Sequence, residues 1–304
     1  MSTGSHKALP GDALLNPLSI PDDSRIPRAS ASGGVADYER YFHISRGAPD
    51  LAAWTRSCLD LQVAVLADLP RTGLDKEQRA GILTGLLLAS HATLMSWTRT
   101  ASAPGETRPG IAAQLSAPST AESAGDQVDA LRRWKLGHQL FHLLLTVMNT
   151  TLDETVAAAR DSQWPSLVGG MERLQALYEA ATAAMTYASD FPSSVYRNEI
   201  RPTMEPPFVA PGFSGVFNRE HHVMVDRLHT LGRALENLPP ESGTIDAIRR
   251  AEASLRAAQR RNRRNHVKIC ERCVPEGGSL RRQHLVREVR EVREVREEGR
   301  NTGA

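Results

Sequence analysis

The stretch Arg263–Cys273, RRNHVKICERC, decides the fold that we expect for this chain. It ends a long helical pattern that begins near Ile245, and a Pro-Glu-Gly-Gly-Ser run follows at 275–279. On a helix, His266 and Cys270 are four residues apart and project from one face. A neutral imidazole is a good axial ligand for haem iron, and a thiol one turn further on could reach the porphyrin edge. The spacing therefore indicates a helix face that could ligate and tether a haem; the alternative is a helix with an exposed imidazole and two unrelated thiols.

Composition excludes several classes of protein. The chain has 304 residues, 40% of them hydrophobic, and a formal net charge of +2. Near-neutral charge gives no argument for nucleic acid or an anionic membrane as partner. Three cysteines (Cys58, Cys270 and Cys273) cannot build a disulfide framework. We found neither an apolar run of 18 or more residues nor a signal-peptide pattern, so we expect a soluble, cytoplasmic protein.

Periodicity predicts an all-α protein. Apolar residues recur at helical spacing in six segments, separated by Pro- and Gly-containing breaks. Residues 1–35 are rich in Pro, Ser, Gly and Asp, which predicts a flexible N-terminal arm. We expect one all-helical catalytic domain over 36–280 and a charged tail over 281–304, where Val-Arg-Glu repeats. The expected helices are 50–69, 75–100, 126–160, 164–188, 216–237 and 245–273, with a loop at 101–125.

The stretch around His266 resembles a known family. Arg-Asn-His-Val followed by a Gly-Gly-Ser loop is similar to the proximal haem helix of tryptophan 2,3-dioxygenases. His266-x3-Cys270 is similar to the motif of a related group, the histidine-ligated haem-dependent tyrosine hydroxylases. The resemblance implies a helical bundle of the tryptophan 2,3-dioxygenase type with a haem between helices. It implies that His266 binds the iron and that Cys270 forms one thioether link.

A second block of resemblance lies in the helix 126–160. His138-Gln139-Leu140-Phe141, with Leu152-Asp153 further along, is similar to the distal helix of the dioxygenases. The resemblance makes His138 the catalytic residue above the haem. The chain departs from the pattern at His142, where the dioxygenases have Glu. His91, within the apolar pattern of 75–100, is the alternative distal base, although a buried or half-buried structural role fits it better.

A third block, Tyr196-Arg197, resembles the Phe-Arg of the dioxygenases whose Arg pairs with the substrate carboxylate. Guanidinium geometry suits that role, so Arg197 is the expected substrate-binding residue, with Arg201 as its competitor. The loop Gly212-Phe213-Ser214-Gly215 alters the Ser-Gly-Phe order of the family. Tyr38 and Tyr41 resemble pocket-lining aromatics, and core packing is the alternative for each.

These residues together predict an enzyme of secondary-metabolite, antibiotic-type biosynthesis. We expect it to hydroxylate L-tyrosine, or a ring-substituted tyrosine such as 3-methyltyrosine, at the 3-position with hydrogen peroxide, giving L-DOPA from tyrosine. Partners would be the amino acid and peroxide, with no nucleic acid or membrane, in a homodimer or higher homo-oligomer. The alternatives are a tryptophan 2,3-dioxygenase-like enzyme and a non-enzymatic helical interaction protein whose basic stretch 249–264 binds an acidic partner. Cys270-x2-Cys273 could also be a zinc half-site, but it lacks a second ligand pair in the sequence.

Overall fold

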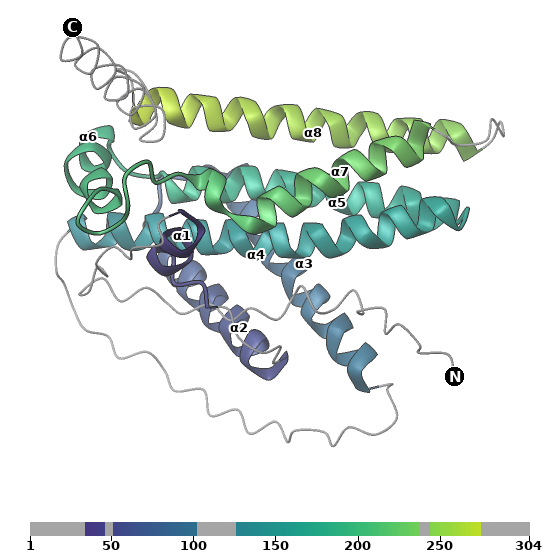
Figure 1. Cartoon of the computed structure of the whole chain (residues 1–304), viewed down its shortest axis with the longest axis horizontal. Coiled ribbons are helices and arrows are strands. Elements are labelled where there is room, and N and C mark those ends of the chain that lie inside the picture. The colour runs from purple at the N-terminus through teal and green to yellow at the C-terminus, as the bar shows by residue number, and fades with distance from the viewer. Residues whose placement is uncertain (1–33, 46–50, 102–125, 237–243, 275–304) are drawn as a thin grey trace, which may run out of the picture.

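Two long antiparallel helices, α4 (Asp126–Arg160) and α5 (Trp164–Ala188), form the centre of the structure (Figure 1). The computed structural model describes residues 34–45, 51–101, 126–236 and 244–274, and no strand occurs in these ranges. The all-helical class expected from the sequence is confirmed, and the six expected helices begin and end within three residues of the observed ones.

The core lies between α4 and α5. Pro165 occupies the first turn of α5, where a missing backbone N–H costs nothing. Both helices present continuous apolar stripes to each other, because leucine and small residues recur every three or four positions. The largest fully buried aliphatic residues of the two helices are Leu136, Leu140, Leu143, Leu144, Leu152, Leu167, Met171, Leu174 and Leu177.

The two central helices approach very closely at Gly137. A Cβ at this position would lie 2.3 Å from the Cβ of Ala188 and 2.6 Å from its Cα. Only a residue without a side chain fits between the two backbones. Gly137 directly precedes His138, so this crossing fixes where the imidazole is presented.

Two further helices complete a four-helix bundle. Helix α7 (Arg219–Glu236) packs on α4, and α8 (Thr244–Cys273) packs on α5. Polar groups also fasten α8 along its length. Asn262 donates to the Thr182 hydroxyl at 3.0 Å, and Asn265 donates to the Thr182 carbonyl at 3.2 Å. These bonds add to the apolar packing of the buried α8 residues Ile248, Ala251, Leu255 and Ala258.

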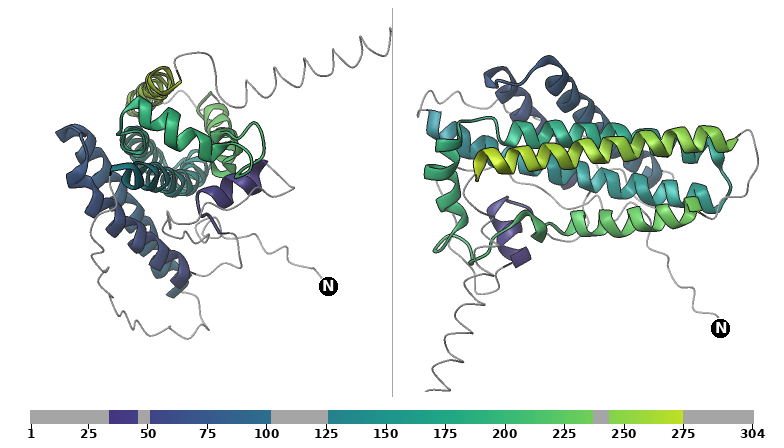
Figure 2. Two further views of the ribbon diagram at one scale, coloured as in Figure 1. Left: turned by 90° about the vertical axis from the view of Figure 1, so that its left-hand side faces the viewer. Right: turned by 90° about the horizontal axis from the view of Figure 1, so that it is seen from above.

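Helices α2 (Leu51–Asp68) and α3 (Lys76–Ala101) form an antiparallel pair on one side of the bundle, away from α7 and α8 (Figure 2). A short 3-10 turn, η2 (Leu69–Arg71), lies in the connection between the two helices. Gly81 and Gly85 let α3 approach α5: a Cβ at either would lie 2.9 Å from the Cβ of Ala183 or Ala180. One face of α3 is therefore pressed against the bundle.

The opposite faces of α2 and α3 differ from expectation. The apolar pattern predicts core residues, but seven large apolar side chains are exposed: Leu59, Val63, Leu66, Leu83, Leu87, Leu94 and Met95. His91 lies among them and is exposed too, so a buried or half-buried role for it is wrong. By length and composition Lys76–Thr98 could also cross a membrane, with a mean hydropathy of 1.3, and 33% of that segment is buried inside the structure.

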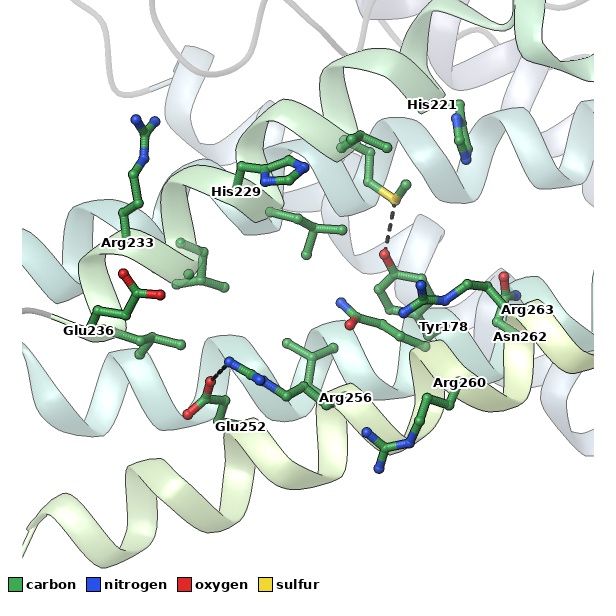
Figure 3. Close-up of a pocket in the computed structure, with 18 residues that line it drawn as sticks. Tyr178, His221, His229, Arg233, Glu236, Glu252, Arg256, Arg260, Asn262 and Arg263 are labelled. Atoms are coloured by element: carbon green, nitrogen blue, oxygen red, sulfur yellow. Dashed lines mark hydrogen bonds and ion pairs between the residues drawn. The ribbon is translucent and has the colours of Figure 1, made fainter.

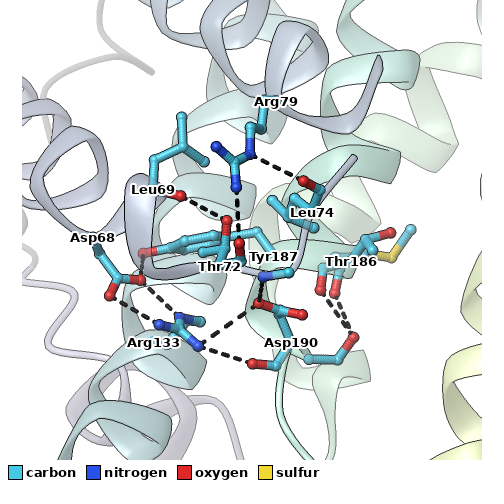
Figure 4. A network of polar contacts seen from close by, with 12 residues as sticks. Asp68, Leu69, Thr72, Leu74, Arg79, Arg133, Thr186, Tyr187 and Asp190 are labelled. Carbon is cyan, nitrogen blue, oxygen red and sulfur yellow. Dashed lines mark hydrogen bonds and ion pairs between the residues drawn. The ribbon is translucent and has the colours of Figure 1, made fainter. Parts of the chain in front are cut away.

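A buried polar network ties α2 and α3 to the bundle (Figure 4). Arg133 of α4 makes a two-pronged contact with Asp68, with Nε–Oδ2 at 2.7 Å and Nη2–Oδ1 at 3.1 Å. Tyr187 of α5 donates its hydroxyl to the same carboxylate at 2.8 Å. The Asp190 carboxylate accepts a hydrogen bond from the backbone N–H of Gly73 at 2.8 Å, and Gly73 lies in the α2–α3 connection. The carboxylates of Asp68 and Asp190 therefore link α2, the α2–α3 connection, α4 and α5.

Short elements close one end of the bundle. They are α1 (Gly34–Tyr41), α6 (Ser193–Val195), the π-helical turn η3 (Tyr196–Ile200), and the 3-10 turns η4 (Arg201–Met204) and η5 (Gly215–Phe217). A π-helical turn is rare and occurs often at functional sites. This end also holds the C-terminal part of α8 (Figure 1), which carries His266 and Cys270.

Candidate functional site

The residues singled out from the sequence come from three distant segments. His138 lies on α4, Tyr196 and Arg197 on η3, and His266 and Cys270 near the end of α8. Burial lowers the pKa of His138, and the nearby charge of His266 lowers it further. Burial raises the pKa of Tyr196 to about 12, and the thiols of Cys273 and Cys270 add to that rise. The fold therefore brings these side chains within electrostatic reach of one another.

The imidazole of His138 is half-buried between two aromatic rings. It stacks on Phe42 with ring centroids 4.3 Å apart and planes 9° from parallel, and it contacts Trp134 at 4.1 Å. Its Nδ1 lies 2.8 Å from the carbonyl oxygen of Trp134. A carbonyl only accepts, so Nδ1 carries the hydrogen and Nε2 holds the lone pair of the neutral ring.

Burial sets the charge of this imidazole. It lowers the pKa of His138 to about 4, although the Trp134 carbonyl partly opposes the shift and the His266 charge adds to it. At neutral pH the ring is therefore uncharged, with one free basic nitrogen. That is the state that can accept a proton from a bound molecule.

An aromatic cluster supports His138 from the side of α1. Tyr38 lies 4.7 Å from Phe42, and Tyr41 lies 5.1 Å from Phe213, measured between ring centroids. Asn218 donates to the Tyr38 hydroxyl at 3.2 Å. Tyr38 and Tyr41 are both buried, so core packing, one of the two expected roles, is what the structure shows. Phe213 joins this cluster despite the altered order of its loop.

Trp134 carries a buried indole N–H that has no hydrogen-bond partner among the described residues. Its ring contacts Tyr196 edge-on, with centroids 5.6 Å apart, and also contacts His138. An unpaired buried donor is costly, because it has left water without compensation. A bound molecule that supplied an acceptor here would relieve that cost.

His266 and Cys270 share one face of α8, as their spacing predicts. The Cys270 Sγ lies 3.7 Å from Nε2 of His266, and both side chains are exposed. Partial burial lowers the pKa of His266, so the ring is neutral at neutral pH and able to bind a metal. Partial burial also raises the pKa of the Cys270 thiol. Cys273, by contrast, is buried at 3% exposure.

Arg197 and Arg201 differ in their surroundings. Arg201 forms an ion pair with Glu205, Nε to Oε1 at 3.5 Å. Arg197 is exposed and makes no ion pair with the residues that the structure describes. Its positive charge acts on the Cys273 thiol, which places it beside the end of α8. Of the two arginines, Arg197 is the one whose guanidinium is available to a carboxylate.

A groove between α7 and α8 was not anticipated. Its volume is about 730 Å³, and Tyr178 of α5 forms part of its floor (Figure 3). His221, Asn262 and Arg263 line the end nearest to His266. The sequence favours a surface position or a dimer contact for both His221 and His222, but His221 is half-buried. Burial lowers its pKa, and the charges of His222 and His266 lower it further. Adjacent histidines on a helix point in different directions, and only the structure shows which one faces inward.

His142 is a second departure from expectation. It lies one turn after His138, is fully buried, and its Nδ1 is 3.2 Å from Oε2 of Glu220 on α7. The dioxygenases that the chain resembles have Glu at this position. In this chain a carboxylate is supplied by Glu220 on the facing helix α7 instead, and the spacing of residues within α4 could not reveal this contact.

Metal chemistry of the zinc type finds no support in the described ranges. They contain no group of three or more His, Cys, Asp or Glu side chains placed to hold a metal ion. The Cys270–Cys273 pair therefore has no further ligands among them. A haem iron takes four of its ligands from the porphyrin, so the protein needs to supply only one or two ligands.

Comparison with known proteins decides the family. The model of the SfmD 3-methyl-L-tyrosine peroxygenase family matches residues 9–266, which is more than half of the chain. The chain belongs to this family. It is also 30% identical over 160 residues to a 3-methyl-L-tyrosine peroxygenase of Streptomyces lavendulae. That alignment spans 50% of the chain and 42% of the relative, so it covers less than half of the relative's length. No solved structure matches the chain.

Membership agrees with the family resemblance noted in the sequence. The family model and the relative carry the same description, that of a 3-methyl-L-tyrosine peroxygenase.

Proposed function

We propose that this peroxygenase is haem-dependent and hydroxylates a tyrosine-type amino acid ortho to its phenol, in the biosynthesis of a secondary metabolite. Family membership carries the proposal. The described relative acts on 3-methyl-L-tyrosine, so this is the first substrate to test, with L-tyrosine, which would give L-DOPA, as the second. In either reaction one peroxide oxygen enters a ring C–H bond and the other leaves as water.

The chain's own residues fit a haem. His266 offers an exposed, neutral imidazole on α8, and the Cys270 thiol lies one turn along the same face. His138 lies across from them on α4, close enough to interact electrostatically with His266. His266 would bind the iron, and Cys270 would hold the porphyrin through a thioether. Haem, when bound, supplies the iron at which peroxide is activated.

The remaining residues bind and orient the substrate. Arg197, which has no carboxylate partner among the described residues, would bind the amino-acid carboxylate in a two-pronged pair. The ring of Trp134, which is only partly buried, would pack on the phenol. Nε2 of neutral His138 would accept the phenolic proton or a peroxide proton.

The test begins with the visible spectrum of purified protein supplied with haem. We expect a Soret band, and we expect His266→Ala to lose it. The holoprotein is then incubated with hydrogen peroxide and 3-methyl-L-tyrosine or L-tyrosine, and the product mass is measured. One added oxygen on either amino acid supports the proposal. A protein that binds no haem overturns it, and oxygen-dependent cleavage of tryptophan without peroxide would identify a dioxygenase instead.

The tether has its own test. Acid–acetone extraction should leave haem on the wild-type protein and release it from Cys270→Ser. The matched control is Cys273→Ser, three residues away and buried, which should keep the haem attached. If the wild-type protein releases its haem to acid–acetone, Cys270 forms no thioether, while the Soret band and product assays still decide the function.

A further inference from the structure

The α2–α3 pair lies on the side of the bundle away from α7 and α8 (Figure 2), and it exposes several large apolar side chains. Its most exposed members are Leu87, at 71% of its full surface, and Leu94, at 63%. Helix α3 has no Asp, Glu, Lys or Arg from Ala80 to Thr98. We call this surface the α2–α3 apolar patch and define it by Leu59, Val63, Leu66, Leu83, Leu87, Leu94 and Met95.

Hydrogen bonds between the two helices set the register of α2 on α3 within the patch. The Trp97 indole N–H donates to the Thr55 hydroxyl at 2.8 Å, and the Ser90 hydroxyl donates to Gln62 at 3.0 Å. In that antiparallel register, Leu59 is level with Leu94 and Leu66 is level with Leu87. The apolar side chains of the two helices therefore lie side by side along one seam.

The spacing of the exposed residues favours pairing with another helix. On α3, the exposed positions Ala80, Thr84, Leu87, His91, Leu94 and Thr98 alternate at steps of four and three. On α2, the exposed residues Leu59, Val63 and Leu66 follow the same alternation. Steps of four and three place side chains on the narrow stripe that one helix presents to another in a coiled-coil-like contact.

We propose that the α2–α3 apolar patch is the interface through which two copies of this chain associate. The α3 stripe is self-complementary when a second α3 runs antiparallel to the first, related by a two-fold axis near the middle of the helix. In that arrangement Leu87 of each copy lies beside His91 of the other. A two-fold contact needs such a self-complementary surface. The stretch from Ala80 to Thr98 is about 27 Å long, and two helices side by side are about 20 Å wide. That footprint is of the same order as the ~800 Å² that each partner buries in a standard interface.

A second copy fits the patch better than a lipid bilayer. A helix that spans a bilayer needs apolar surface on every side, and α3 is instead pressed against α5 through Gly81 and Gly85. Polar side chains of Thr84, His91 and Thr98 also interrupt the stripe. Hydroxyl and imidazole groups find partners in a protein interface but not in hydrocarbon.

The experiment measures the mass of the full-length protein by sedimentation across a hundredfold range of concentration. We expect a dimer for the wild type, and at least 100-fold weaker self-association for the double variant Leu87→Lys with Leu94→Lys. Both side chains are exposed, so the variant should keep its helical circular dichroism. The control is Val223→Lys on α7, which is 39% exposed and outside the patch; it should remain a dimer.

A charge-reversal pair sharpens the test. The variant with Lys at 87 and 94 is mixed with one carrying Glu at both positions, and the mixture should form a dimer that neither variant forms alone. A wild type that stays monomeric, with or without binding to vesicles of neutral and anionic lipid, would overturn the proposal. So would a dimer that the Lys substitutions leave intact.

Discussion

At the scale of single residues, the charge state of His138 follows from its surroundings rather than from its position on a helix. Phe42 and Trp134 exclude water from the ring, and the Trp134 carbonyl fixes the hydrogen on Nδ1. A pKa of about 4 keeps the ring neutral at neutral pH.

The lowered pKa of His138 should make the free energy of unfolding depend on pH. An unfolded histidine binds a proton below about pH 6.5, whereas His138 in the folded protein resists it until about pH 4. The unfolded state therefore gains protons first, so the free energy of unfolding should fall as the pH drops from about 6.5 to about 4. Replacing His138 with Gln should remove on the order of 1–2 kcal/mol of that fall. Denaturant titrations of both proteins across this window measure it; parallel curves would mean that the imidazole remains hydrated.

Arg197 and Arg201 provide a matched pair for substrate binding. Arg201 is occupied by Glu205, whereas Arg197 has no carboxylate partner in the described ranges. Arg197→Ala should raise KM for the amino acid by about 10- to 100-fold, because a charge-assisted pair is worth about 1.5–3 kcal/mol. Arg201→Ala should change KM much less. Steady-state kinetics of the haem-loaded enzyme decide between them, and the reverse ranking would move the carboxylate site to Arg201.

At the scale of elements, the α4–α5 crossing at Gly137 holds the site in place. Gly137→Ala places a methyl group 2.3 Å from the Ala188 Cβ, so the helices must separate or shift. We expect a loss of about 1–3 kcal/mol of stability, which is typical of overpacking, together with impaired activity because His138 is the next residue. Gly169→Ala on α5 is the control, since a Cβ there meets nothing within 4 Å. It should stabilise the protein by up to about 1 kcal/mol; thermal unfolding of both variants tests the contrast.

Helix boundaries were the most predictable part of the structure, because Pro165, Pro70 and Gly73 interrupt strong apolar periodicity at the right places. Which helix face is covered was less predictable. The pattern of Leu59, Val63 and Leu66 is that of a buried stripe, yet these residues face outward. A single sequence shows only the spacing of apolar residues along a helix. A helix face that contacts another molecule has the same spacing as a face that packs in the core.

At the scale of the whole molecule, the Asp68–Arg133 network links α2, α4 and α5 through buried polar groups. The Asp68 side chain is 3% exposed, and Asp68→Asn would leave the Arg133 guanidinium without its carboxylate. We expect a loss of about 3–5 kcal/mol, the usual result of breaking a buried pair. Asp153→Asn is the control, because its pair with Arg227 is partly exposed and should contribute about 1 kcal/mol or less.

The same network has a defined pH dependence. Burial would raise the pKa of Asp68, but hydrogen bonds from Arg133 and Tyr187 outweigh it and hold the pKa below its usual value. Its contribution is therefore present above about pH 4 and is lost as the pH falls through the lowered folded pKa. The difference in unfolding free energy between wild type and Asp68→Asn should narrow below about pH 4. A difference that stays constant to pH 2.5 would show that Asp68 does not titrate there.

The shared helix face of His266 and Cys270 was predictable, because both residues lie on one helix. His266 also lies close enough to His138, and Arg197 close enough to Cys273, for their charges to interact, while the roles given to these residues stay predictions. His221 and Glu220 could not be found in this way. They act across the space between α7 and its neighbours, and their roles depend on the rotation of α7, which is set by packing against α4.

Helix α8 follows every other described helix in the chain, and it carries both His266 and Cys270. During synthesis on the ribosome, α1 to α7 therefore emerge before either residue exists. Until then the α5 surface under α8 stays uncovered. If His266 and Cys270 hold haem as proposed, the group can be bound only after translation has passed position 270, and loading with haem follows the synthesis of the rest of the bundle.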